Sequence, residues 1–188
     1  MEYEVLGYPP DAPTLRLDHE RFAYAGKFVM SDTGKAVARD PGDPIDSGEG
    51  WDTPVGATSF SEHHDQSERA RIRYVTVRED RRGEGVGPRL LRFTADALTG
   101  RFAAVAIAVN NPIAYQAAYR AGFAWTGRET GMAELLLSYL PGTATANRYR
   151  AGFEVFESRD LPAQHRTLVE RHADGDPPSP VSVPAVDG

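Results

Sequence analysis

The chain has 188 residues and a mass of 20.6 kDa, which is the size of one domain with a sizeable core. Its 27 acidic residues outnumber its 21 basic ones, and the net charge of −6 disfavours sequence-independent binding to nucleic acid. The absence of cysteine excludes disulfides, iron–sulfur clusters, thiolate zinc sites and cysteine nucleophiles.

The first third of the chain contains strand and turn signals. Residues 14–17 follow a proline-rich turn and are predicted to be a strand. Residues 21–30 have aromatic and β-branched side chains around a glycine and are predicted to be a strand or hairpin. Residues 35–39 and 55–60 are predicted to be further strands. Residues 40–54 are rich in proline, glycine and acidic side chains, which indicates a loop between them.

The centre of the chain predicts a βαβα unit. Residues 72–77 have the β-branched and aromatic composition of a strand, and Pro88 suits the first turn of an amphipathic helix that follows. Residues 105–109 form a near-continuous apolar run, which is typical of a strand buried on both faces. Asn111 then caps a second helix, which Gly122 ends.

This order of elements predicts the fold class, α/β. A strand–helix–strand connection places its two strands in parallel, so we expect parallel pairing between residues 72–77 and 105–109. The expected architecture is a mixed, strongly twisted sheet with helices on both faces.

The last third is predicted to contain strands over residues 123–126, 132–140 and 148–157, and a short helix over residues 162–172. Residues 173–188 contain four prolines and almost no large apolar side chain, which indicates a disordered tail. We therefore predict a single domain over residues 1–172 and a tail over residues 173–188.

A glycine-rich loop separates the strand at residues 72–77 from the helix that follows it. Its sequence is Arg82-Gly83-Glu84-Gly85-Val86-Gly87-Pro88. Glycines permit positive φ and a close approach of the backbone, and the loop's N–H groups lie at the positive end of the helix dipole. Such a loop is a cradle for phosphate or pyrophosphate. A tight turn in which the glycines serve packing alone explains them equally well.

Two common phosphate-binding motifs are excluded. A P-loop requires Gly-Lys-Ser/Thr, and no lysine follows Lys35. A dinucleotide fingerprint that begins at Gly83 requires a glycine where Pro88 stands.

The remaining pattern is Arg-x-x-Gly-x-Gly, formed by Arg82, Gly85 and Gly87. It resembles the acetyl-CoA signature of the GNAT N-acetyltransferase superfamily, usually written Q/R-x-x-G-x-G/A. The segment that starts at Asn111 and ends at Gly122-Phe123 is similar to the superfamily's N-x-x-A…G-F element. The resemblance covers residues 55–140 and is weak at the N-terminus, which has little room for the usual pair of helices.

The resemblance implies that acetyl-CoA is the co-substrate. The CoA pyrophosphate would lie on the loop amides, and the pantetheine would pair like an extra strand with residues 74–77, where a backbone N–H stabilises the thioester oxyanion. A primary amine, on a small molecule or a peptide, would attack the acetyl carbon directly. The implied cofactor-binding residues are Val75, Thr76, Val77, Arg82, Gly83, Glu84, Gly85, Val86, Gly87, Pro88 and Asn111.

The general acid departs from the superfamily's pattern. The superfamily often has a tyrosine four residues before the Gly-Phe glycine, where it protonates the departing thiolate, and Ala118 occupies that position here. We predict that Tyr119 supplies the proton instead, with Tyr115 or water as alternatives. Both tyrosines also suit buried core positions with a hydrated hydroxyl.

The general base is predicted to be Glu62, which ends a strand near the expected substrate cleft together with His63, His64 and Asp65. Glu134, in a later strand, is a further candidate. Each of these side chains also suits a solvated surface position.

These observations leave three classes of function. The first is an acetyl-CoA-dependent N-acetyltransferase, the second a non-catalytic acyl-CoA-binding or regulatory module, and the third a structural domain whose loop binds nothing. No apolar run approaches the roughly 20 residues of a membrane span and no signal peptide is present, so we expect a cytoplasmic protein without a membrane or nucleic-acid partner. The adjacent His63 and His64 lack the spacing of a helical zinc pair, and we expect no metal.

Overall fold

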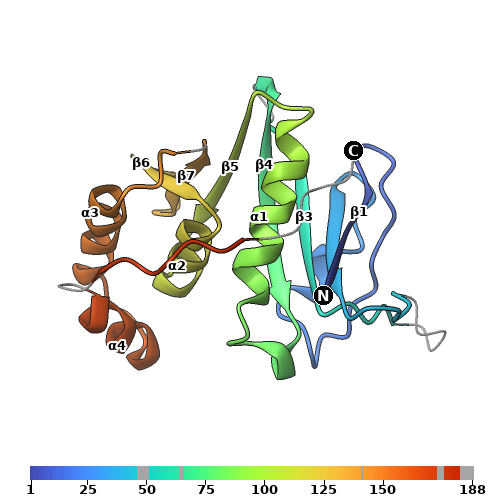
Figure 1. Cartoon of the computed structure of the whole chain (residues 1–188), viewed down its shortest axis with the longest axis horizontal. Coiled ribbons are helices and arrows are strands. Elements are labelled where there is room, and N and C mark those ends of the chain that lie inside the picture. The colour runs from blue at the N-terminus through green and yellow to red at the C-terminus, as the bar shows by residue number, and fades with distance from the viewer. Residues whose placement is uncertain (46–50, 64–65, 141, 173–175, 183–188) are drawn as a thin grey trace.

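The computed structural model describes residues 1–45, 51–63, 66–140, 142–172 and 176–182. Its strands form one seven-stranded sheet in the order β1-β2-β3-β4-β5-β7-β6, flanked by helices, which confirms the predicted fold class (Figure 1). The strands are β1 (Glu2–Gly7), β2 (Gly34–Arg39), β3 (Gly56–His63), β4 (Gln66–Val77), β5 (Ala104–Val109), β6 (Phe123–Glu129) and β7 (Leu135–Tyr139). The helices are α1 (Val86–Thr99), α2 (Pro112–Arg120), α3 (Ala146–Glu157) and α4 (Ala163–His172), with 3-10 turns η1 (Ala25–Lys27) and η2 (Glu79–Arg81).

Strands β4 and β5 are parallel, as predicted, and the other neighbouring strands are antiparallel. The parallel pairing begins at Arg69–Ala104 and ends at Ile72–Ile107. Beyond Ile72, β4 continues to Val77 and pairs with β3 alone among the described strands. The edge of β4 on the β5 side is therefore unpaired over its last residues.

β4 carries a bulge at Arg73. Tyr74 pairs with Ser59 of β3 and Ile72 pairs with Phe60, so Arg73 is the extra residue between them. The extra residue resets the alternation of side chains, so Ile72 belongs to the core cluster under α1 whereas Tyr74 packs with the core cluster on the opposite face. A bulge bends its strand, and this one lies where β4 parts from β5.

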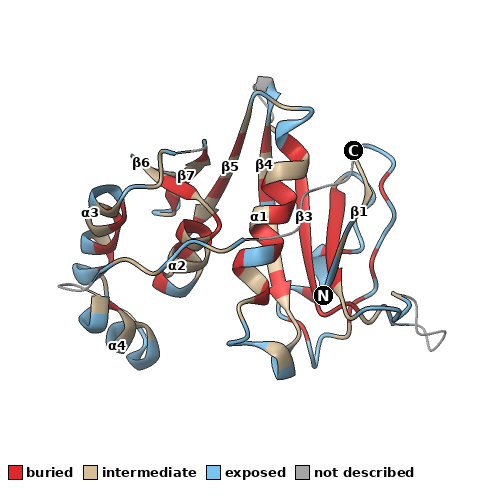
Figure 2. Cartoon of the chain, viewed as in Figure 1, coloured by how far each residue is buried: buried red, intermediate tan, exposed pale blue. Residues whose placement is uncertain are grey.

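Helices α1 and α2 pack on one face of the sheet, which we call the helix face. Its core joins apolar residues of α1, β5, α2 and β7, and Figure 2 shows buried residues along α1 and the strands behind it. A buried hydrogen bond of 2.9 Å between the hydroxyls of Thr58 in β3 and Thr94 in α1 ties the helix to the sheet. Burial of polar atoms is tolerated here because each hydroxyl has a partner.

β5 differs from the prediction. The apolar run 105–109 was expected to be buried on both faces, but only Val105, Ile107 and Val109 are buried, and the alanines between them are partly exposed. The prediction was wrong because a run of apolar residues does not show that both faces are covered: two of its five members, Ala106 and Ala108, are alanines, which bury little area.

The other face of β2 and β3 is covered by the segment between β1 and β2, which contains η1 but no α-helix among its residues. The prediction of helices on both faces is therefore wrong for this region. Residues 21–30 are not a strand or hairpin, and residues 14–17 contribute only an isolated bridge between Leu17 and Asp52. Leu15, Phe22 and Phe28 pack their side chains onto the sheet instead of extending it. Sequence analysis also identified no strand at the position of β1.

The C-terminal third contains one further error. Residues 148–157 were predicted to be a strand, but they lie in α3, which Thr145 caps by accepting a hydrogen bond from the Arg148 N–H. Their aromatic residues favour a strand by composition, yet Tyr149, Phe153 and Phe156 follow helical spacing and are buried on one side of α3. α4, β6 and β7 confirm the remaining predictions.

The tail after α4 is described only over residues 176–182, which extend past the end of α2. The Val181 N–H donates to the Arg120 carbonyl at 2.8 Å. Residues 173–175 and 183–188 lie outside the described residues, so the disorder of the tail and the domain boundary at residue 172 stay predictions. No helix in the described ranges has the length and apolar character needed to span a membrane.

Candidate active site

The glycine-rich loop leads directly into α1. Gly83 and Gly85 have left-handed φ values of +85° and +75°, which other residues rarely adopt, and Gly85 is the N-cap of α1. No side chain of the described residues caps this end of the helix. The first N–H groups of α1 are therefore available to an external acceptor, and the helix dipole favours an anion there.

Arg81 holds the loop in place. Its guanidinium donates to both carboxylate oxygens of Asp40, at 2.6 and 3.3 Å, and to the Glu84 carboxylate at 3.0 Å. The hydrogen bonds from Arg81 lower the pKa of the Asp40 carboxyl below its usual value. Arg89 adds a hydrogen bond of 2.9 Å to the Glu84 carbonyl. Sequence analysis missed Arg81, because its role depends on Asp40, which is distant in the chain.

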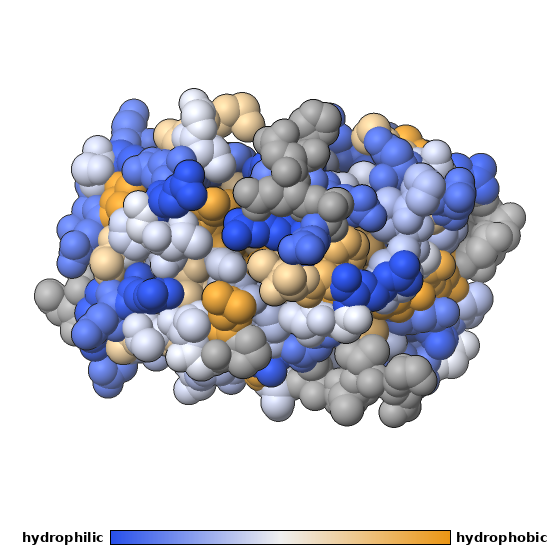
Figure 3. All heavy atoms as spheres, turned by 90° about the horizontal axis from the view of Figure 1, so that it is seen from above, coloured by the Kyte–Doolittle hydropathy of each residue, from blue (hydrophilic) through white to orange (hydrophobic). Residues whose placement is uncertain are grey.

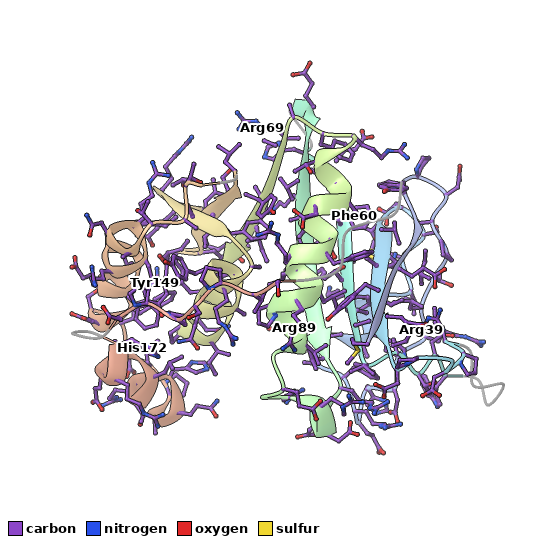
Figure 4. The ribbon with its side chains drawn as sticks, viewed as in Figure 1. Arg39, Phe60, Arg69, Arg89, Tyr149 and His172 are labelled. Carbon is purple, nitrogen blue, oxygen red and sulfur yellow. The ribbon has the colours of Figure 1, made fainter. Side chains whose placement is uncertain are left out.

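The residues predicted to bind CoA fall into two groups. Arg82, Gly83 and Glu84 are exposed, Gly85 and Gly87 are partly exposed, and Val86 and Pro88 are buried as the first turn of α1. Figure 4 shows Arg89 at this end of α1. Arg82 donates a hydrogen bond of 3.4 Å to the Val77 carbonyl, which joins the loop to the end of β4. The structure thus brings the loop together with the last residues of β4.

The second group lies on β4 itself. Val75, Thr76 and Val77 pair with β3 on one side, and none of the described strands pairs with them on the other. The Thr76 hydroxyl is buried and has no hydrogen-bond partner among the described residues. An extended ligand fits this edge, since it would find backbone groups that the sheet leaves unused. Asn111 has a structural role as well, because its side chain caps α2 by accepting from the Ala114 N–H at 2.9 Å.

The tyrosines of α2 face α3. Tyr115 donates its hydroxyl to the carbonyls of Arg148 and Tyr149, both at 3.1 Å, and burial raises its pKa. The ring of Tyr119 lies 4.4 Å from that of Tyr149, centroid to centroid, and burial raises its pKa too. Figure 4 shows Tyr149 between α2 and α3. These contacts favour the core alternative for both tyrosines, and the assignment of Tyr119 as general acid stays a prediction.

The candidate bases lie apart from one another. Glu62 is exposed and pairs with Ala70, so it lies toward the end of β4 that is far from the glycine-rich loop. His64 and Asp65 lie outside the described residues. Glu134 precedes β7 beside the end of β5, where it forms an ion pair with Arg71. Among the described residues, no group of three or more histidine and carboxylate side chains is arranged to hold a metal ion.

A separate cavity of about 430 Å³ lies between α3 and α4, lined by residues from Phe156 to Glu170. Neither β4 nor the glycine-rich loop contributes to it. The outer surface seen in Figure 3 is largely hydrophilic, with smaller hydrophobic areas between the charged side chains. The loop and the free β4 edge, and not this cavity, combine the features of a phosphate site with those of an extended-ligand site.

Comparisons with known proteins give the family of the chain. A model of the acetyltransferase (GNAT) family matches residues 10–123. Among solved structures, nourseothricin acetyltransferase is 20% identical with a TM-score of 0.47, over 73% of this chain and 96% of that one. A protein of Streptococcus mutans is 19% identical with a TM-score of 0.46, over 62% and 77% of the two chains. A comparison with curated proteins finds no match. Because the family model spans more than half of the sequence, the chain belongs to the GNAT acetyltransferase family.

Proposed function

We propose that the protein transfers the acetyl group of acetyl-CoA to a primary amine by direct attack. The observation that carries the proposal is one juxtaposition: the uncapped N-terminus of α1, entered through Gly83 and Gly85, adjoins the stretch of β4 that has no β5 partner. The first feature suits a diphosphate, and the second suits an extended chain with amide groups. CoA contains both.

Under this proposal two parts of CoA, the diphosphate and the pantetheine, are held by backbone groups. The diphosphate oxygens accept hydrogen bonds from N–H groups between Arg82 and Pro88, and the pantetheine amides pair with β4 between Tyr74 and Val77. A backbone N–H of this edge then faces the thioester oxygen. A donor in that position stabilises the negative charge of the tetrahedral intermediate, and its loss typically costs about 10²–10³ in rate.

The reaction balances without a metal or a covalent enzyme intermediate. The neutral amine nitrogen forms a bond to the acetyl carbon and gives up one N–H proton to solvent, the carbon–sulfur bond breaks, and the thiolate leaves with the electron pair and is protonated. Because Ala118 carries no proton donor and Tyr119 packs against α3, we propose that solvent protonates the thiolate.

The alternative is a module that binds acyl-CoA without catalysis. Ala118, at the position where a tyrosine is usual, favours it. Release of free thiol from acetyl-CoA in the presence of a panel of amines separates the two functions. Steady release that depends on one class of amine supports the transferase, whereas binding without amine-dependent release supports the module.

Calorimetry with acetyl-CoA and a Gly85→Val variant tests the site. Valine cannot adopt the left-handed backbone of Gly85 without strain, so the loop amides should lose their arrangement. We expect a loss of affinity of about 10- to 100-fold, the worth of one or two hydrogen bonds to a charged group.

Gly142→Val is the matched control, because Gly142 has a similar φ of +79°, has open space around it and lies between β7 and α3. It should bind acetyl-CoA like the wild type. Equal affinity in both variants would place the CoA site elsewhere.

A further inference from the structure

One area of the sheet has no covering layer among the residues that the structure describes. Residues that pair across β4, β5 and β7 on the side away from α1 are Arg71, Ala106 and Ser138, followed by Ala108 and Leu136 one row further on. All of them are partly exposed, whereas their sequence neighbours on the helix face are buried. We call this area the open face. It adjoins the free edge of β4, since Ala108 is the first β5 residue beyond the last β4–β5 pair.

An ion pair crosses the open face. The Arg71 guanidinium lies 3.6 Å from the Glu134 carboxylate, and the two side chains are 30% and 20% exposed. The alanines of β5 leave room for the Arg71 side chain to extend over them. At 3.6 Å the pair is not a hydrogen bond, and Arg71 donates no hydrogen bond to any other described residue. A guanidinium carries a planar set of donors that matches a carboxylate, and none of the described residues accepts a hydrogen bond from the Arg71 guanidinium.

Glu134, by contrast, is fixed. Its carboxylate accepts a hydrogen bond of 3.1 Å from the Thr130 hydroxyl, and its backbone closes the β6–β7 turn with Thr130 at 2.8 Å. Ala133, next to it, has a left-handed φ of +57°. A non-glycine residue in that conformation is strained, and such strain is concentrated at functional sites. The carboxylate is therefore held in position while its partner, Arg71, keeps free donors.

The border of the open face toward the N-terminal segment is aromatic. The rings of Tyr24 and Tyr74 lie 5.7 Å apart, and Tyr24 has the other left-handed φ, +60°, found among described non-glycine residues. The Lys27 ammonium lies 6.0 Å from the centre of the Tyr74 ring. Arg73 precedes Tyr74 in the chain, so Lys27 and Arg73 place two cationic residues beside Tyr74 in a protein whose net charge is −6. A basic area of this kind attracts an anionic group.

From this arrangement we infer that the acceptor is an amine that also carries a carboxylate, of the α-amino acid class, with its carboxylate on Arg71 and its ammonium group on Glu134. The two charges of such a molecule complement the two charges of the Arg71–Glu134 pair. A polyamine lacks the group that would use the donors of Arg71 and meets Lys27 and Arg73 as like charges. The inference rests on the proposed function, and it adds the class of the acceptor.

The experiment compares amino acids with the amines that remain when their carboxylate is removed, for example phenylalanine with phenethylamine and leucine with isoamylamine. Thiol release from acetyl-CoA is measured for each pair. We expect the amino acids to be acetylated with a kcat/KM at least about tenfold higher than that of the matching amines. Tenfold is the lower end of the effect expected from one hydrogen bond to a charged group. Equal or better use of the amines without a carboxylate would overturn the inference, as would the absence of transfer to any amino acid in a protein that binds acetyl-CoA.

Arg71→Gln is the diagnostic variant. It should raise KM for the amino acid about 10- to 100-fold and leave the poor reaction of the matching amine unchanged. Arg69→Gln is the matched control, since Arg69 lies one row away on β4, toward the end remote from the glycine-rich loop (Figure 4). It should behave like the wild type. A loss of the same size in both variants, or for both substrates, would show a structural effect and contradict the assignment.

Two binding measurements separate this inference from the proposed function. Acetyl-CoA affinity, measured by calorimetry, should be the same in the wild type and in Arg71→Gln. Binding of the amino acid itself, followed by ligand-observed NMR without CoA, should be lost in Arg71→Gln and weakened in Glu134→Gln. If the protein binds the amino acid through Arg71 but has no affinity for acetyl-CoA, the proposed acetyltransferase function is refuted and the amino acid site on the open face is supported. CoA binding without any such amino acid binding would refute the site alone.

Discussion

The two faces of β5 and β7 are built from the same short strands but are used differently. On the helix face, Val105, Ile107, Leu135 and Leu137 are buried under α1 and α2. On the open face, alanine, serine and leucine side chains stay partly exposed. Since residues alternate between the two faces, one strand supplies both buried core positions and partly exposed positions. The comparison shows that neighbouring positions of one strand differ in burial, so substitutions at them should differ in their effect on stability.

The largest expected effect comes from truncating a leucine on the helix face. Leu137→Ala removes a fully buried side chain from the core and should lower the free energy of unfolding by about 2–5 kcal/mol. Leu136→Ala, one residue earlier and on the open face, should cost less than about 1 kcal/mol, because little area is lost from the core. Urea denaturation of both variants measures the difference. Equal costs would mean that the open face is covered in solution.

The second prediction concerns β2 and β3, where the segment between β1 and β2 covers the face of the sheet opposite to the helix face. Lys35 is fully buried, and its ammonium group donates to the carbonyls of Met30 and Thr33, at 2.7 and 2.5 Å, and to the Thr33 hydroxyl at 2.8 Å. Lys35→Met should lower the free energy of unfolding by about 1.5–3 kcal/mol, the worth of hydrogen bonds from a charged donor. Lys27→Met, at an exposed position, is the control in the same denaturation experiment and should change little.

The third prediction uses alkaline pH to probe the helix side. Burial raises the pKa of Tyr149 to about 12, against about 10 in an unfolded chain. The folded protein therefore holds this proton more tightly, so its contribution to stability is complete below pH 10 and is lost as the pH rises toward 12. Denaturation at several pH values should show that the free energy of unfolding of the wild type falls over this range. In Tyr149→Phe the decrease should be smaller by roughly 1–2 kcal/mol. Parallel curves for the two proteins would contradict the assignment.

The smallest effect is expected for Tyr119→Phe, which keeps the ring against Tyr149 and removes only the hydroxyl. If Tyr119 is a core residue, turnover should change by less than about tenfold. If it protonates the thiolate, turnover should fall by about 10²–10⁴ while acetyl-CoA affinity stays constant. The kcat of this variant therefore decides between the predicted acid and the solvent.

Sequence patterns predicted those parts of the site that are local in the chain. The glycine-rich loop, Pro88 in the first turn of α1 and the Asn111 cap each depend on a few consecutive residues, so they could be identified before the fold was known. The contacts of Arg81 with Asp40 and of Arg71 with Glu134 could not, because they join segments that only the folded sheet brings together.

The errors have the same origin. α3 was predicted as a strand because its aromatic composition outweighed its helical spacing, and that spacing becomes decisive only where a surface exists to pack against, here α2. The segment between β1 and β2 has apolar residues that follow neither period, since they pack one by one onto a preformed sheet.

The bulge at Arg73 has a consequence for how the chain tolerates deletions. A strand without the extra residue would keep Ile72 and Tyr74 on their present faces but would lose the bend that draws β4 away from β5. Deletion of Arg73 would thus preserve the hydrophobic pattern and the core, and it would allow β4 and β5 to stay paired toward Val77. The unpaired edge of β4 would then close, so the extra residue accounts for the free edge on which the proposed CoA site depends.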